Sequence, residues 1–272
     1  MTTKNRCSIV GFIICILVSI ILLSLIYPAN AKSKKKTYVL AKEIMTEYDS
    51  TGEEEVTYVH KYKYDKNWLL KKIKTSTDTW QYCYYSFSYK DGLLKKGKSN
   101  SYFASYKLDS DSAKFSYNKK GKLIKVKIYN RKGKLRQIRK LKRNKRGDYL
   151  ELKVYNKKGK MLSMTKYFFD KNGRSIKGED YKNGSMIKHW YAEYQTNDGR
   201  MVKTIITQSL KSKVLITEKY FYDKNGNAKL YKRYDKNDNL REVCKYKYKI
   251  IKTKKVKAVK EQQYILFELY YI

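Results

Sequence analysis

The sequence has few of the residues that build catalytic or cross-linked sites. Its 272 residues include 2 His, 3 Trp and 4 Cys. Cys7 and Cys15 lie in the apolar leader, and the remaining Cys83 and Cys244 are too few for a disulfide scaffold. The sequence also lacks a Gly-rich phosphate loop, a zinc-spaced Cys/His cluster and a nucleophile elbow. We therefore expect no catalytic residues, no metal and no cofactor, and we predict that the protein is not an enzyme.

Acidic residues are scarce as well. There are 25 Asp+Glu against 63 Lys+Arg, which gives a net charge of +38. A surface this basic attracts polyanions. The alternative is that the charge only keeps a repetitive β-protein soluble and prevents its sheets from associating.

The N-terminus has the features of an export signal. Lys4 and Arg6 precede an apolar run over residues 9–26, and Pro28 and small residues follow it. This pattern predicts a signal peptide over residues 1–31. About 18 apolar residues can also cross a bilayer, so an uncleaved membrane anchor is the alternative. Residues 32–36 (KSKKK) would then form a basic arm, and residues 37–272 the folded domain.

A short turn signature recurs through this domain. An aromatic residue is followed by Asp or Asn, two polar residues and Gly, as in YNKKG at 117–121 and YDKNG at 222–226. The Asp or Asn side chain can cap the turn, and Gly can adopt the left-handed conformation. We predict a type I turn with a following bulge, closing a hairpin, at each copy. The predicted turn glycines are Gly121, Gly133, Gly147, Gly159, Gly173, Gly199 and Gly226.

The spacing of these glycines is regular. Gly121, Gly147, Gly173 and Gly199 recur every 26 residues, and Gly226 follows one residue late. A unit of this length is two strands and two turns, and such periodicity marks an array. We predict an all-β fold, a long antiparallel meander of hairpin repeats with about 14–16 strands, curled or partly closed, after an N-terminal signal helix. The repeat is most regular over residues 114–248.

Residues between the turns alternate in character. Ile124, Val126 and Ile128 fall on one face of a predicted strand, and Leu150, Leu152 and Val154 on one face of another. The opposite face carries Tyr and Lys, which can stack on sugars or bases and hold phosphate or carboxylate groups. The alternative is that this face only solvates the sheet. The candidate binding residues are Lys125, Lys127, Tyr129, Tyr149, Lys153 and Tyr155.

Cys83 and Cys244 test whether the sheet closes. They are 161 residues, or about 12 strands, apart, so an open sheet would separate them by more than about 50 Å. A disulfide needs Cα atoms within about 7 Å. An open meander therefore predicts two free thiols, whereas a closed barrel would allow a bond.

Two stretches resemble known repeats. The segments KYFYDKNGNAKLYKRYDKNDNLREV at 219–243 and FSYNKKGKLIKVKIYNRKGKL at 115–135 resemble YD repeats of the Rhs type, which occur in secreted and surface proteins of bacteria. That resemblance implies a β-repeat at the bacterial cell surface. The segments KYFFDKNGRS at 166–175 and KYFYDKNGNA at 219–228 resemble cell-wall-binding repeats, whose aromatic cages bind choline or glucan.

These observations predict a secreted or cell-surface, non-enzymatic β-repeat protein, retained by electrostatic binding to an anionic cell-wall polymer or glycan. The alternative is a repeat scaffold that binds a protein partner, as an adhesin or a toxin neutraliser. Nucleic acid is not expected as a partner, and membrane contact is expected only through an uncleaved leader.

Overall fold

The computed structural model describes residues 37–78, 81–103, 106–145, 148–197, 200–210 and 215–251. The predicted signal peptide, the basic arm and residues 252–272 of the predicted domain lie outside these ranges, as do the predicted turn residues Gly147 and Gly199. Within them, no helix is long and apolar enough to cross a membrane.

Every regular element in the described ranges is a strand. In chain order the strands are β1 (Thr37–Tyr48), β2 (Glu54–Tyr64), β3 (Leu70–Thr77), β4 (Gln81–Lys90), β5 (Leu93–Phe103), β6 (Tyr106–Asp109), β7 (Ser112–Tyr117), β8 (Leu123–Tyr129), β9 (Leu135–Arg143), β10 (Tyr149–Asn156), β11 (Met161–Phe169), β12 (Ser175–Lys182), β13 (Ser185–Asn197), β14 (Arg200–Ser209), β15 (Leu215–Tyr222), β16 (Ala228–Tyr234) and β17 (Leu240–Ile251).

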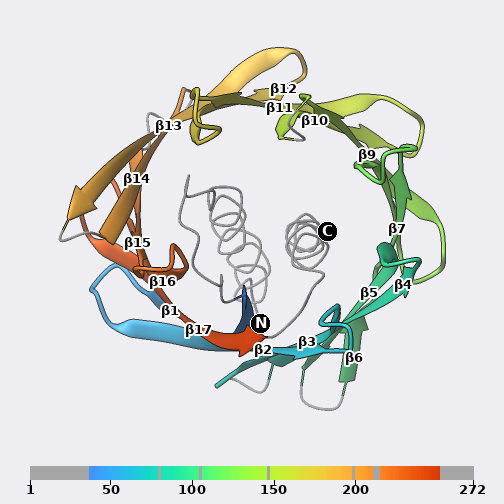
Figure 1. Ribbon diagram of the computed structural model, residues 1–272, viewed down its shortest axis with the longest axis horizontal. Coiled ribbons are helices and arrows are strands. Elements are labelled where there is room, and N and C mark those ends of the chain that lie inside the picture. The colour runs from blue at the N-terminus through green and yellow to red at the C-terminus, as the bar shows by residue number, and fades with distance from the viewer. Residues whose placement is uncertain are drawn as a thin grey trace, which may run out of the picture.

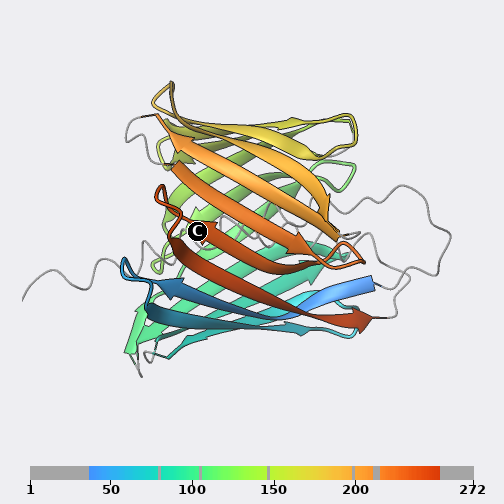
Figure 2. The same cartoon turned by 90° about the vertical axis from the view of Figure 1, so that its left-hand side faces the viewer.

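The strands form one closed antiparallel barrel (Figure 1). Strands pair in chain order, and β1 pairs with both β2 and β17. Because β6 and β7 both pair with β5, the 17 segments occupy 16 positions around the wall. Figure 2 shows the strands crossing this wall at a common tilt. The predicted all-β meander is confirmed, and its closure is complete.

The described turns have the predicted chemistry. At residues 118–121 the Asn118 side-chain oxygen accepts the backbone N–H of Lys120 at 3.0 Å and of Lys122 at 2.9 Å. Gly121 has φ 72° and donates its N–H to the Asn118 carbonyl. Where the sequence lacks the glycine, Trp68 (φ 62°) and Asp238 (φ 59°) take the same left-handed position.

The bulge after each turn changes which face a residue occupies. On β8, Leu123, Val126 and Ile128 are buried, whereas Ile124 is 39% exposed. The prediction that Ile124 shares a face with Val126 is therefore wrong, because the extra residue of the bulge shifts the alternation by one. A bulge between Tyr149 and Glu151 has the same effect.

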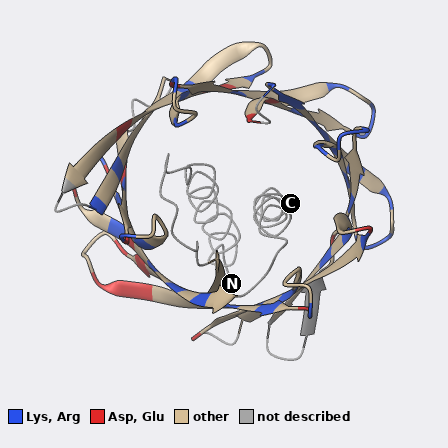
Figure 3. Ribbon diagram, in the orientation of Figure 1, with Lys and Arg blue, Asp and Glu red and all other residues tan. Residues whose placement is uncertain are grey.

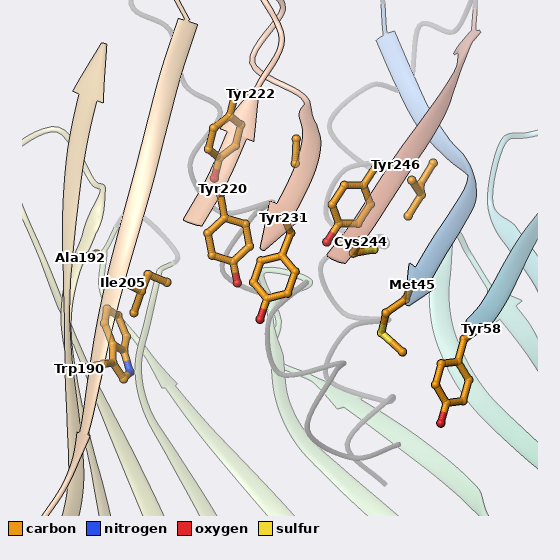
Figure 4. Packing of buried hydrophobic residues seen from close by; sticks show 12 residues of the cluster. Met45, Tyr58, Trp190, Ala192, Ile205, Tyr220, Tyr222, Tyr231, Cys244 and Tyr246 are labelled. Carbon is orange, nitrogen blue, oxygen red and sulfur yellow. The ribbon is translucent and has the colours of Figure 1, made fainter. Parts of the chain in front are cut away.

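Figure 1 shows a wall that is one strand thick. The outer face of such a wall meets solvent, so the buried side chains lie on the inner face. Figure 4 shows part of this inner face, where residues of β13 to β17, β1 and β2 form one hydrophobic cluster. Tyr220 and Tyr231 lie side by side there, with ring centroids 4.8 Å apart, and neither is exposed.

Ionisable groups also lie on this inner face. The Tyr231 hydroxyl donates to Glu218 Oε1 at 3.0 Å, and Arg233 pairs with Glu242 at 3.4 Å. Lys203 is fully buried, and its Nζ makes no hydrogen bond within the described part of the chain. Burial lowers the pKa of Lys203 to about 7, although Glu218 opposes the shift.

Cys83 on β4 and Cys244 on β17 are both buried and free. Barrel closure leaves only β1, β2 and β3 between their strands, which is still about 19 Å along the wall. Closure alone therefore does not bring these thiols within bonding distance. Burial raises the pKa of both thiols, as expected for inert cysteines.

The turn glycines can be tested at Gly121. A Cβ at this position would meet no other atom within 4 Å, so Gly121→Ala changes only the backbone preference. We expect a loss of about 1 kcal/mol in the free energy of unfolding, measured by urea denaturation, and a smaller loss for Gly121→Asn. The control Lys119→Ala, in the same turn, should change it by less than about 0.5 kcal/mol. Equal losses in the free energy of unfolding for Gly121→Ala and Gly121→Asn would contradict the requirement for a left-handed backbone conformation at this position.

The buried amine can be tested with Lys203→Met. The folded-state pKa of about 7 lies below the ordinary 10.5, so between these values the unfolded chain binds a proton that the folded chain does not. Wild-type stability then rises with pH across this window. We expect Lys203→Met to raise the free energy of unfolding most at pH 6 to 7, and progressively less towards pH 10. If the difference in the free energy of unfolding between Lys203→Met and the wild type did not change with pH, the lowered pKa of Lys203 would be contradicted.

Candidate functional site

Five of the six predicted binding residues lie half-buried on the outer face of the barrel. They are Lys125, Lys127, Tyr129, Lys153 and Tyr155. Tyr149 does not join them. It is 3% exposed, packs in the inner cluster of β3 to β10, and its hydroxyl accepts a hydrogen bond from Arg143. The prediction that Tyr149 belongs to the Tyr/Lys face is wrong, because the bulge beside it reverses the alternation.

Lysines lie directly opposite one another across strands of the outer face. We call these rows lysine ladders. The first ladder comprises Lys247, Lys42, Lys61 and Lys74, on β17, β1, β2 and β3. The second comprises Lys96, Lys114 and Lys127, on β5, β7 and β8. The third comprises Lys125, Lys140 and Lys153, on β8, β9 and β10.

Such ladders oppose folding. Side chains directly opposite on neighbouring antiparallel strands have Cβ atoms about 4.5–5.5 Å apart, and like charges there destabilise the pair. Figure 3 shows Lys and Arg on strands all round the barrel. The three ladders lie on β17, β1 to β3, β5 and β7 to β10. A surface with facing amines of this kind is suited to a ligand that places negative charge between them.

Neighbouring tyrosines and acids offset part of this repulsion. Lys114 Nζ lies 5.2 Å from the ring centre of Tyr129, and Lys140 Nζ lies 4.8 Å from that of Tyr155. Lys153 pairs with Glu151 at 3.0 Å, and this hydrogen bond raises the pKa of Lys153. The Tyr/Lys face is therefore held partly in place before any ligand binds.

Two open hollows lie on the wall beside the second ladder. One, of about 420 Å³, is lined by Lys98, Ser110, Ser112, Asn130, Arg131 and Gly133. The other, of about 410 Å³, is lined by Ser86, Phe87, Ser88, Lys96, Gly97, Lys98, Ser112, Ala113 and Lys114. Their polar lining consists of amines, a guanidinium, an amide and hydroxyls, the groups that bind anions and sugar hydroxyls.

A different part of the outer wall is apolar. Large hydrophobic side chains are exposed on β11 to β15 and the turns between them, with Tyr191 the most exposed among them at 49%. The set comprises Met161, Leu162, Phe168, Ile176, Met186, Ile187, Tyr191, Ile206, Leu210 and Leu215. Tyr191 and Ile206 are direct cross-strand partners, so part of the set is contiguous.

The two histidines lie in unlike places. His60 is buried on the inner face, where its Nδ1 lies 2.7 Å from the Thr75 hydroxyl and burial lowers its pKa. His189 lies on the outer face beside Tyr191, with ring centroids 5.3 Å apart. Within the described residues, no three His, Cys, Asp or Glu side chains are grouped so that they could hold a metal ion.

The sequence by itself does not point to most of these groups. Lys61 and Lys74 stand in the alternating stretches KYKY (61–64) and KIKT (72–75), so their place on the polar face of each strand was predictable. The position of the ladder lysines opposite one another was not, because it depends on strand register and on the pairing of β1 with β17.

No family model matches the chain, and no curated protein matches it. Among solved structures, the chain is similar to a porin-like protein from Bacteroides uniformis, with 12% identity over 78% of this chain and 96% of that one, and a TM-score of 0.51. A porin-like protein from Bacteroides vulgatus also has 12% identity, over 78% of this chain and 99% of that one, but with a TM-score of 0.33. At this identity the first likeness shows the fold alone.

Proposed function

We propose that the protein is a secreted or surface-associated, non-enzymatic β-barrel that binds anionic polymers or glycans of the cell envelope through its lysine ladders. The observation that carries the proposal is the direct cross-strand opposition of Lys247, Lys42, Lys61 and Lys74. In the isolated barrel, this opposition of like charges lowers the stability of the fold. A bound polymer with repeated negative groups converts each repulsive pair into a shared binding site.

The geometry suits a polymer better than a single ion. Neighbouring strands are about 4.8 Å apart, so the amines of the first ladder extend for about 14 Å across four strands. A chain with phosphate or carboxylate groups at regular intervals can contact several of these amines at once. Each contact releases a condensed counterion, so affinity depends steeply on salt.

The same ladders favour an outer wall that faces water. A Lys directed into the middle of a bilayer from a barrel costs about 2–4 kcal/mol, and Lys61 and Lys74 are exposed on the outer face. The porin-like neighbour supports the fold of the barrel. An extracellular or cell-surface location rests on the predicted leader, with anchoring through an uncleaved leader as the alternative. The relation to YD repeats stays a prediction.

The apolar side of the wall favours a second candidate function, the binding of a specific protein partner. Phe168, Tyr191 and Ile206 are exposed there, and apolar patches of this kind mark protein interfaces in many proteins. As an adhesin or a toxin neutraliser, the barrel would bind through β11 to β15. Such an interface depends little on salt.

Retention on isolated cell walls tests the first proposal. Changing Lys42, Lys61, Lys74 and Lys247 together to Gln should weaken binding by at least about tenfold at low salt and reduce its salt dependence. The control changes four exposed turn lysines to Gln, at Lys119, Lys157, Lys224 and Lys236, and thus removes the same charge. Because these lysines belong to none of the ladders, the control should bind close to the wild type.

A salt wash separates the two candidate functions. If the electrostatic proposal holds, about 1 M NaCl releases the wild-type protein from the walls. Retention through that wash, or equal loss of binding in the ladder variant and the turn control, would overturn it. Retention that instead depended on Tyr191 and Ile206 would favour the protein-partner function.

A further inference from the structure

A cluster of three tyrosines stands on the outer face of β4 and β5. Tyr82 and Tyr102 are cross-strand partners with rings stacked at 4.9 Å and 11°. Tyr84 lies edge-on to both, at 5.4 Å from Tyr82 and 6.0 Å from Tyr102. Each ring holds its neighbours in position, so the tyrosine cluster is a preorganised aromatic surface at the boundary with water.

Tyr82 and Tyr102 of this cluster differ from other tyrosines of the outer face. Tyr129, Tyr155 and Tyr234 each have a Lys amine over the ring, at 4.8–5.4 Å from its centre. In the cluster, Lys74 lies over Tyr84 at 5.8 Å, and Tyr82 and Tyr102 stack on each other. The first lysine ladder therefore ends at the cluster, because Lys74 is the cross-strand partner of Tyr84.

Polar residues continue the row of outer cross-strand pairs from the tyrosine cluster along β4 and β5. The successive outer pairs are Tyr82 with Tyr102, Tyr84 with Asn100, Ser86 with Lys98, and Ser88 with Lys96. At about 6.7 Å for each step of two residues, these four cross-strand pairs span about 20 Å along the strands. They lead into the hollow of about 410 Å³, where Ser112 of β7 faces Lys98.

We propose that this row is a binding groove for an anionic glycan, a polysaccharide with carboxylate or phosphate groups along its chain. The tyrosine cluster contacts the apolar face of a sugar ring, the hydroxyls of Ser86 and Ser112 and the amide of Asn100 bind sugar hydroxyls, and Lys96 and Lys98 bind the anionic groups. The inference rests on the proposed function and names the polymer class that this function leaves open.

The combination of groups separates a glycan from other polyanions. A polyphosphate without sugars offers no ring to the tyrosines and no hydroxyl donors to the serines, so the lysine ladders alone would bind it. A nucleic acid would stack its bases on the cluster. Hydroxyls in a hollow lined by lysines, with the Asn100 amide beside the tyrosine cluster, match a polymer that has both sugar hydroxyls and acidic groups.

The test compares two polymers on the full-length protein. Polygalacturonate carries one carboxylate per sugar, and long-chain inorganic polyphosphate has charge but no sugar. We expect Tyr82→Thr with Tyr102→Thr to weaken binding of polygalacturonate by at least about tenfold and of polyphosphate by less than about twofold, with the salt dependence of both unchanged. Thr is chosen because it favours strands. The control is Tyr181→Thr with Tyr234→Thr, two outer tyrosines outside the groove, which should change neither affinity.

A second variant guards against loss of folding in the first. Ser86→Val with Ser112→Val removes the hydroxyls from the hollow while keeping strand-favouring residues, and it should show the same selective loss for polygalacturonate. Thermal unfolding checks that each variant is folded.

Four outcomes would overturn the groove. Unchanged binding of polygalacturonate in both variants, or equal losses for the two polymers, would overturn it and leave the electrostatic function standing. Selective loss of single-stranded oligonucleotide binding would assign the cluster to bases instead. If the wild type binds neither polymer at low salt, both the groove and the proposed function fail.

Discussion

The pairing of β1 with β17 joins the first and last described strands and closes the sheet into a barrel. The different chemistry of the inner and outer faces depends on this closure. The register of the pairing runs from Thr37 opposite Ile251 to Glu47 opposite Glu242, with one bulge. Because this pairing leaves neither β1 nor β17 with a free edge, backbone groups of these strands that would otherwise invite another chain are paired within the barrel. Closure also divides every strand into an inner and an outer face, and the two faces have different chemistry.

The inner face combines large apolar groups with buried polar ones. Tyr220, Tyr231 and Ile205 are fully buried there, and so are Lys203 and Glu242. A buried amine is costly unless it is neutral or paired. The lowered pKa of Lys203 is the direct consequence, since burial disfavours its charged form.

The outer face has the opposite problem, because its charges repel one another across short distances. The turns that build hairpins bring lysines into direct opposition wherever neighbouring strands carry Lys in matching positions. Tyr rings under the lysine amines reduce the cost without removing the charge. A basic wall with an aromatic cluster at the end of one ladder is a surface on which electrostatic attraction and ring stacking can act on the same polymer. This is the physical link between the fold and the proposed function.

Local chemistry determined much of this protein. The Asx-capped turns, the left-handed glycines and the alternation between them follow from neighbouring residues, so the sequence predicted the strands, the meander and the Tyr/Lys face. It could not predict that Tyr149 turns inward or that Ile124 turns outward, because a bulge of one residue reverses the alternation. Nor could it place Lys247 beside Lys42, or Tyr82 on Tyr102, because cross-strand neighbours depend on register and on closure between residues far apart in the chain. The sequence thus determined each hairpin, whereas the tertiary structure alone decided which side chains of different hairpins lie together.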